Sequence, residues 1–132
     1  MVSGIRPPSQ RMLKVGEEVR HALAEVFLRG EAHAPELEGV SITVSEVRMT
    51  PDLKLAIAYI ATLGAHPVEK LLPLLNRQYE RTIRRAIAPK LHLKFLPQVR
   101  FKVDESFDEA QKINRLLHQA KDSGASHLTD ET

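Results

Sequence analysis

Residues 40–63 read VSITVSEVRMTPDLKLAIAYIATL, and this stretch decides the fold of the chain. Apolar residues alternate with polar ones in its first half and with small or charged ones in its second half, which is the period of a half-buried β-strand. Between the halves lies Thr50-Pro51-Asp52, where proline pre-sets a turn dihedral angle and aspartate bonds back to the backbone. The stretch therefore predicts two antiparallel strands joined by a tight turn.

The first of these strands changes its alternation part-way along. Val44 and Val47 are separated by an odd number of positions, so a regular strand would place them on opposite faces. A β-bulge across Ser45 and Glu46 would keep both inside. In the second strand, predicted over Leu53–Leu63, the small side chains at 56 and 58 share one face and allow a helix to approach closely.

Helices are predicted on both sides of this hairpin. The first begins after Ser9, a good N-cap, and ends before Gly30. Its apolar residues recur every three or four positions, at Met12, Val15, Val19, Ala22, Leu23, Val26 and Phe27. The second begins near Pro67, and Pro73 is expected to kink or split it. Its apolar stripe contains Leu72, Leu75, Tyr79, Ile83, Ala86 and Ile87.

The rest of the chain predicts one more strand and one more helix. Leu91, Leu93 and Phe95 alternate, and after Pro97 the alternation resumes through Val103, which indicates extended chain with a break. The run from Ser106 to Glu109 is a capping box for a last helix ending near Ala120. The order helix, strand, strand, helix, strand, helix predicts an α+β fold with the helices packed on one face of a three-stranded sheet.

The composition is that of one ordinary globular domain. The chain has 132 residues, of which 42% are hydrophobic and 27% charged, and no cysteine. We expect a flexible lead-in over residues 1–8, one domain over 9–120 and a mobile acidic tail over 121–132. The first residues lack the apolar core of a secretion signal and no apolar run could span a membrane, so a cytoplasmic protein is expected. A monomer is also expected, although no sequence feature specifies the oligomeric state.

Positive charge is concentrated between residues 77 and 102. This segment holds eight Lys and Arg against one acid, Glu80, a balance of +7 in a chain whose net charge is +2. Such a local surplus attracts polyanions, although an outward charged face is also typical of a solvated helix. Arg81 and Arg84 are expected to project away from the apolar stripe, so reversing both charges should weaken binding and leave the fold intact. The predicted nucleic-acid-binding residues are Arg77, Arg81, Arg84, Arg85, Lys90, Lys94, Arg100 and Lys102.

Other chemistry-bearing residues have ordinary explanations. Tyr59, Tyr79, Phe95 and Phe101 all occupy apolar positions, which favours core packing over base stacking. The acids Asp104, Glu105, Asp108 and Glu109 surround a predicted helix N-terminus, where capping accounts for them better than a catalytic pair or a magnesium site. The six histidines lack zinc-site spacing, and no nucleophile motif is present. We therefore expect no enzyme activity, cofactor, metal or small-molecule substrate.

Several motifs together resemble the bacterial ribosome-binding factor A family. They are Arg6-Pro7 through Gln10-Arg11, Thr43–Val47 to Pro51-Asp52-Leu53, Ala56–Tyr59, and Ile83-Arg84 through Leu93, Pro97 and Phe101. The resemblance covers roughly residues 6–117. It implies a type II K-homology (KH)-like domain without a GXXG loop, and no glycine occurs between Gly64 and Gly124. In this family a kinked helix with an Ala-X-Gly signature replaces the loop, and here Tyr79-Glu80-Arg81 departs from that signature.

The resemblance also implies a function. It indicates a non-enzymatic assembly factor that binds the immature small (30S) ribosomal subunit and aids 16S rRNA maturation. The charge distribution, independently of the resemblance, suggests the basic helix and strand as the RNA contact. A general RNA- or DNA-binding module without ribosomal preference is the main alternative. A domain whose basic face binds an acidic protein is a second, and an enzyme is the third.

Overall fold

The computed structural model describes residues 7–63 and 67–106 of the chain. The predicted last helix and tail, and all of the lead-in before residue 7, lie outside these ranges. The described elements, in chain order, are helix α1 (Gln10–Leu28), the short 3-10 helix η2 (Pro35–Leu37), strands β1 (Ser41–Met49) and β2 (Leu55–Leu63), helix α2 (Val68–Pro73), the π-helix η3 (Leu74–Gln78), helix α3 (Glu80–Ile87), the 3-10 helix η4 (Ala88–Lys90) and strand β3 (Gln98–Val103).

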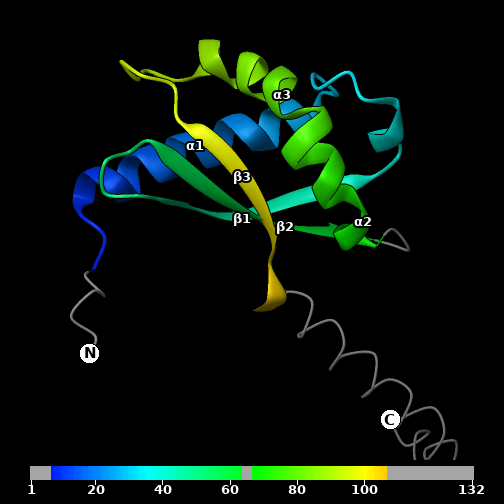
Figure 1. Cartoon of the computed structure of the whole chain (residues 1–132), viewed down its shortest axis with the longest axis horizontal. Coiled ribbons are helices and arrows are strands. Elements are labelled where there is room, and N and C mark those ends of the chain that lie inside the picture. Colours follow the sequence, from blue (N-terminus) through cyan, green and yellow to red (C-terminus); the bar gives the residue numbers. More distant parts are fainter. Residues whose placement is uncertain (1–6, 64–66, 107–132) are drawn as a thin grey trace, which may run out of the picture.

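The three strands form one sheet in the order β1-β2-β3. β1 runs antiparallel to β2, and β3 runs parallel to β2. The helices pack on one face of this sheet (Figure 1). β3 is an edge strand, and α2, η3 and α3 all contact it. The predicted α+β fold, with helices on a three-stranded sheet, is confirmed. The other face of the sheet carries mainly exposed and half-buried side chains.

The predicted β-bulge is present in β1. The pairing of β1 with β2 shifts between Val44 and Glu46, which leaves Ser45 as the extra residue. Because of this shift, Val44 and Val47 are both buried on the helix-covered face. The Ser45 side chain, on the bulge, hydrogen-bonds to Asp104 just beyond β3. The bulge therefore keeps the core continuous and links β1 to the end of the opposite edge strand.

Helix α1 begins and ends where the sequence predicts. The Ser9 hydroxyl accepts a hydrogen bond of 3.1 Å from the Met12 amide. Gly30 has φ +66°, the left-handed conformation that commonly follows a helix C-terminus. Val19, Leu23 and Val26 of the predicted stripe are fully buried. The helix packs mainly against β1.

The second predicted helix is split, as the proline at position 73 indicates. After Pro73 the chain continues as the π-helix η3, and Tyr79 then leaves helical geometry with φ −107° and ψ 8°. The Tyr79 amide donates to the carbonyl of Leu74, five residues back, at 2.8 Å. The Tyr79 hydroxyl donates to the carboxylate of Glu36 in η2, which fixes the break against the loop after α1.

The segment predicted as extended chain over residues 91–95 does not join the sheet. The chain from Leu91 to Pro97 makes no strand pairing, and β3 begins only at Gln98. As a result, alternation does not bury every second residue here: Phe95 is 77% exposed, whereas Phe101 inside β3 is 1% exposed. The prediction that Phe95 belongs to the core is therefore wrong, and the prediction for Phe101 is confirmed.

Candidate nucleic-acid interface

Three of the predicted arginines form an exposed row on the broken helix. Arg77 lies in η3, and Arg81 and Arg85 lie one turn apart in α3. All three are exposed, while Ile83 and Ile87 on the opposite side of α3 are fully buried. Within the described residues none of the three forms an ion pair, so their positive charge is available to a ligand. We call Arg77, Arg81 and Arg85 the arginine row.

Arg84 and Lys90 are instead occupied by contacts within the chain. The Arg84 guanidinium donates to the carbonyls of Pro97 at 3.2 Å and Leu96 at 3.5 Å, and its Nε lies 3.6 Å from a Glu80 carboxylate oxygen. Its side chain is only 28% exposed. The expectation that Arg84 projects into solvent is therefore wrong. It anchors the connection before β3 to α3.

Lys90 bridges two acids at the far end of α1. Its ammonium nitrogen lies 3.0 Å from a Glu31 carboxylate oxygen and 3.3 Å from one of Glu25. The hydrogen bond to Glu31, together with that to Glu25, raises the pKa of Lys90. Lys90 is thus held in a charged form, but its charge is already neutralised by two neighbours. It joins the turn after α3 to α1.

Arg100 and Lys102 lie on the open face of the sheet. Their neighbours Val99 and Phe101 point into the core, so the alternation of β3 turns both basic side chains away from the helices. Arg100 pairs with Ile57 of β2, and Ile57 pairs in turn with Arg48 of β1. Three cations therefore flank the half-buried apolar side chains of the central strand.

Arg48 belongs to this open face, although it was not among the predicted residues. Its Nε lies 2.8 Å from a Glu46 carboxylate oxygen, and its guanidinium carbon lies 5.5 Å from the centre of the Tyr59 ring. The signal was present in the sequence, because a bulge at position 45 turns residue 48 to the face opposite Val47. Tyr59 is half-buried on that same face and does not belong to the core.

Asn76 joins the helix side of the interface to the edge strand. Its side-chain amide donates to the Phe101 carbonyl at 3.0 Å and accepts from the Phe101 amide at 2.7 Å. Both backbone groups at the exposed edge of β3 are thereby satisfied. Because Arg77 follows Asn76 directly, the arginine row runs beside the strand that carries Arg100 and Lys102. Sequence reasoning missed this contact.

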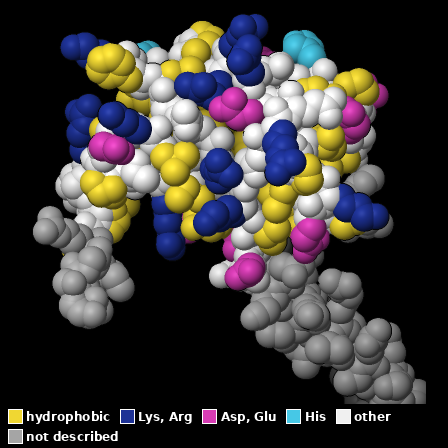
Figure 2. Space-filling model, in the orientation of Figure 1, with side chains coloured by type: hydrophobic (Ala, Val, Ile, Leu, Met, Phe, Trp, Pro, Cys, Tyr) yellow, Lys and Arg dark blue, Asp and Glu magenta, His cyan; other side chains and the backbone are white. Residues whose placement is uncertain are grey.

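The predicted basic set is therefore divided between two faces that meet at the edge of β3. The arginine row lies on the helix side, Arg100 and Lys102 lie on the open sheet face, and Lys94 is exposed in the connection before β3. Figure 2 shows Lys and Arg side chains spread over the side of the molecule where β3 and α3 lie, with acidic side chains between them.

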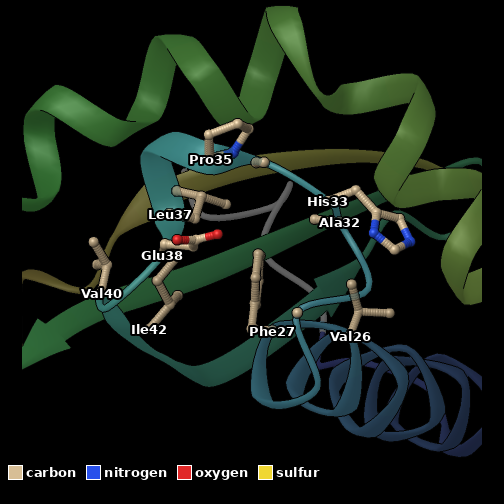
Figure 3. A pocket seen from close by; sticks show the side chains of 11 residues that line it. Val26, Phe27, Ala32, His33, Pro35, Leu37, Glu38, Val40 and Ile42 are labelled. Atoms are coloured by element: carbon tan, nitrogen blue, oxygen red, sulfur yellow. The ribbon is translucent and has the colours of Figure 1, made fainter.

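A hollow at the C-terminal end of α1 lacks the chemistry for a polyanion. It has a volume of about 390 Å³ and lies between Val26 and Phe27 of α1, the loop with η2, and the approach to β1. In Figure 3 its walls are mainly apolar, with His33 and Glu38 as the polar side chains. No Lys or Arg lines it.

Neither a metal centre nor a membrane span is found in the part of the chain that the structure describes. No three His, Asp or Glu side chains converge there as metal ligands. No helix in those ranges is both long and apolar enough to cross a bilayer. Of the four acids at the predicted last helix, Asp104 accepts a hydrogen bond of 3.1 Å from the Ser106 amide. Asp108 and Glu109 lie outside the described residues.

Comparison with known proteins decides the family. The family model described as ribosome-binding factor A matches residues 11–117. The chain belongs to the ribosome-binding factor A family. A relative from Bradyrhizobium diazoefficiens, named ribosome-binding factor A, is 50% identical over 109 residues, which cover 83% of this chain and 75% of the relative. The resemblance inferred from the sequence motifs is thereby confirmed.

Solved structures of the family share the fold. The crystal structure of ribosome-binding factor A from Thermus thermophilus is 25% identical, with a TM-score of 0.56 over 70% of this chain and 94% of that one. A Thermus thermophilus RbfA homology model fitted into a cryo-EM map of a 30S–RbfA complex is 22% identical, with a TM-score of 0.52 over 69% of this chain and 92% of that one. The KH-like fold is thus the family fold.

The helix break is present although the sequence lacks the Ala-X-Gly signature that the resemblance implies. By the correspondence on Pro97 inferred from the sequence, that signature would fall on Tyr79, Glu80 and Arg81. Tyr79 is the non-helical residue between η3 and α3. A bulky tyrosine therefore occupies the interruption, and its hydroxyl bond to Glu36 provides a contact that alanine could not make.

Proposed function

We propose that this protein is a non-enzymatic assembly factor that binds the immature small (30S) ribosomal subunit and aids maturation of its 16S rRNA. The observation that carries the proposal is an unpaired arginine row, beside the basic edge strand, in a member of a family of ribosome-binding factors. The related Thermus protein, fitted into a map of a 30S–RbfA complex, supports the small subunit as the partner.

The RNA contact in this proposal is electrostatic. Phosphate groups need only correctly placed positive charge, which the arginine row supplies on the helix side, and Arg100, Lys102 and Lys94 extend it around the edge of β3. Arg84 and Lys90 have a different role, because their contacts position the elements that carry the other cations. Such a surface gives affinity and orientation on folded rRNA without reading base sequence.

The maturation step follows from differential affinity. A factor that binds one rRNA conformer more tightly than another shifts the population toward the first, with no covalent chemistry. The binding unit is the single domain over residues 9–120, acting as a cytoplasmic monomer without cofactor, small-molecule substrate or membrane.

The test is neutralisation of the arginine row. The variant R77Q/R81Q/R85Q removes three positive charges from exposed side chains, so its fold and melting temperature should match the parent. Each lost phosphate contact lowers the slope of log affinity against log salt by about 0.7–0.9, so a loss of roughly 2–3 in slope is expected if all three bind phosphate. Binding is measured on purified small subunits over a salt series.

A matched control separates position from net charge. The variant R11Q/K14Q/R29Q removes the same number of charges from exposed residues in and just after α1. It is expected to keep most of the parent's affinity for small subunits. Equal losses in both triple variants would show that affinity follows net charge alone, and no loss in the arginine-row variant would exclude the helix as the main contact.

A further inference from the structure

Phe95 is a large aromatic side chain that the fold leaves in solvent. It lies in the connection between η4 and β3 and is 77% exposed, while its neighbours Leu91 and Pro97 are buried. The Lys94 ammonium nitrogen lies 5.7 Å from the centre of the Phe95 ring. An exposed ring beside a cation is therefore presented at a fixed place next to the basic surface.

The ring borders a hollow at the end of the sheet. The hollow has a volume of about 450 Å³, which is within the range of small-ligand sites. Its walls come from the turn between β1 and β2, from α3 and from the start of β3; they are Asp52, Leu53, Lys54, Leu55, Arg84, Phe95, Leu96 and Gln98. With Lys94 beside the ring, apolar groups, one aromatic ring and two lysines, Lys54 and Lys94, lie around the hollow, whereas the Arg84 guanidinium is engaged by backbone carbonyls and Glu80.

Hydrogen bonds hold these walls in place. The Gln98 amide donates to the Lys54 carbonyl at 2.9 Å, which fixes the start of β3 to the hairpin turn. The Arg84 contact with the Pro97 carbonyl fixes the connection to α3. Asp52 accepts from the Thr50 hydroxyl at 2.7 Å, so its carboxylate is committed to the turn. The hollow is therefore a preformed feature.

We propose that Phe95 stacks on an unpaired base of the bound RNA, with Lys94 and Lys54 placed to neutralise the adjoining phosphates. This inference rests on the proposed function, because it assumes that the ligand is RNA. Stacking on an aromatic ring needs an exposed face and suits any base, and flanking lysines complement the phosphates on either side of that base. The contact adds base stacking to a surface that otherwise binds phosphate alone.

A tryptophan reporter tests the stacking directly. The sequence contains no tryptophan, so the variant F95W carries a single one. Titration with a short single-stranded RNA is expected to quench its fluorescence, whereas an abasic oligonucleotide of equal length and charge should not. Quenching to the same extent by both would overturn the proposal, since phosphates alone would then account for the signal.

Matched variants separate this site from general RNA binding. L28W places one tryptophan at another exposed hydrophobic position, at the end of α1, and should not be quenched. F95L should weaken binding of the RNA oligonucleotide about ten-fold, and F95Y, which keeps the ring, should retain affinity. Quenching of F95W by an acidic peptide and not by RNA would assign the hollow to a protein partner and contradict the proposal.

The two proposals can fail separately. If F95L binds small subunits and RNA as tightly as the parent while the arginine-row variant loses affinity, the stacking site is wrong and the proposed function stands. If the parent protein itself shows no affinity for small subunits, the proposed function fails. Circular dichroism spectra and melting temperatures of F95L and F95W should equal those of the parent, because the ring is outside the core.

Discussion

Gly16 lies in the middle of α1 and sets the distance between this helix and the sheet. A Cβ atom at this position would lie 2.6 Å from the Val47 carbonyl oxygen of β1, whereas ordinary contacts begin at 3.4 Å. In an exposed helix, replacing glycine by alanine stabilises by about 1 kcal/mol. Here α1 would have to move away from β1 by up to 0.8 Å, the difference between those two distances. Overpacking of this kind costs about 1–3 kcal/mol, so G16A should be less stable by roughly 1 kcal/mol.

The assay is the free energy of unfolding from urea titration. Lys14, which is exposed on α1, provides the internal control, because K14A should be more stable than K14G by about 1 kcal/mol through helix propensity alone. Replacing glycine by alanine should therefore lower the free energy of unfolding at position 16 and raise it at position 14. A G16A protein more stable than its parent by the same amount as K14A over K14G would refute the close approach of α1 to β1.

Two further predictions concern the broken helix. N76A leaves the amide and carbonyl of Phe101 without their side-chain partner and should cost about 1–3 kcal/mol in urea titration, while Q78A, at a neighbouring position outside the core, should cost little; equal costs would contradict the contact. The hydrogen bond from the Tyr79 hydroxyl lowers the pKa of Glu36, so its stabilisation is present above the free glutamate pKa and is lost as the pH falls through the folded value. Y79F should therefore reduce the difference in stability between neutral and acidic pH, and an unchanged difference would exclude this hydrogen bond.

Most of the fold could be predicted because the signals are local. The change of alternation around Ser45 marks the bulge, Ser9 and Gly30 mark the ends of α1, and Pro73 marks the split helix. Each of these effects depends on residues within a few positions of one another. The connection before β3 could not be predicted in this way, because alternation does not reveal whether an extended segment finds a strand to pair with.

The candidate site was less predictable, because contacts with residues far away in the sequence decide which of its side chains are free. Helical projection correctly gave the exposed positions of Arg81 and Arg85, but it could not show that Arg84, one residue earlier than Arg85, reaches the carbonyls before β3. The role of Asn76 likewise depends on a strand 25 positions away. Sequence charge alone therefore overestimates the number of cations that are available to a ligand.

The central claim is that the protein distinguishes the immature small subunit from other RNA. The most direct measurement is the affinity of the parent protein for immature small subunits, mature small subunits, large subunits and an unrelated structured RNA over a salt series. We predict the tightest binding to immature small subunits, with affinity falling steeply as salt rises. Equal affinity for all four at every salt concentration would contradict the claim and leave a general polyanion-binding domain.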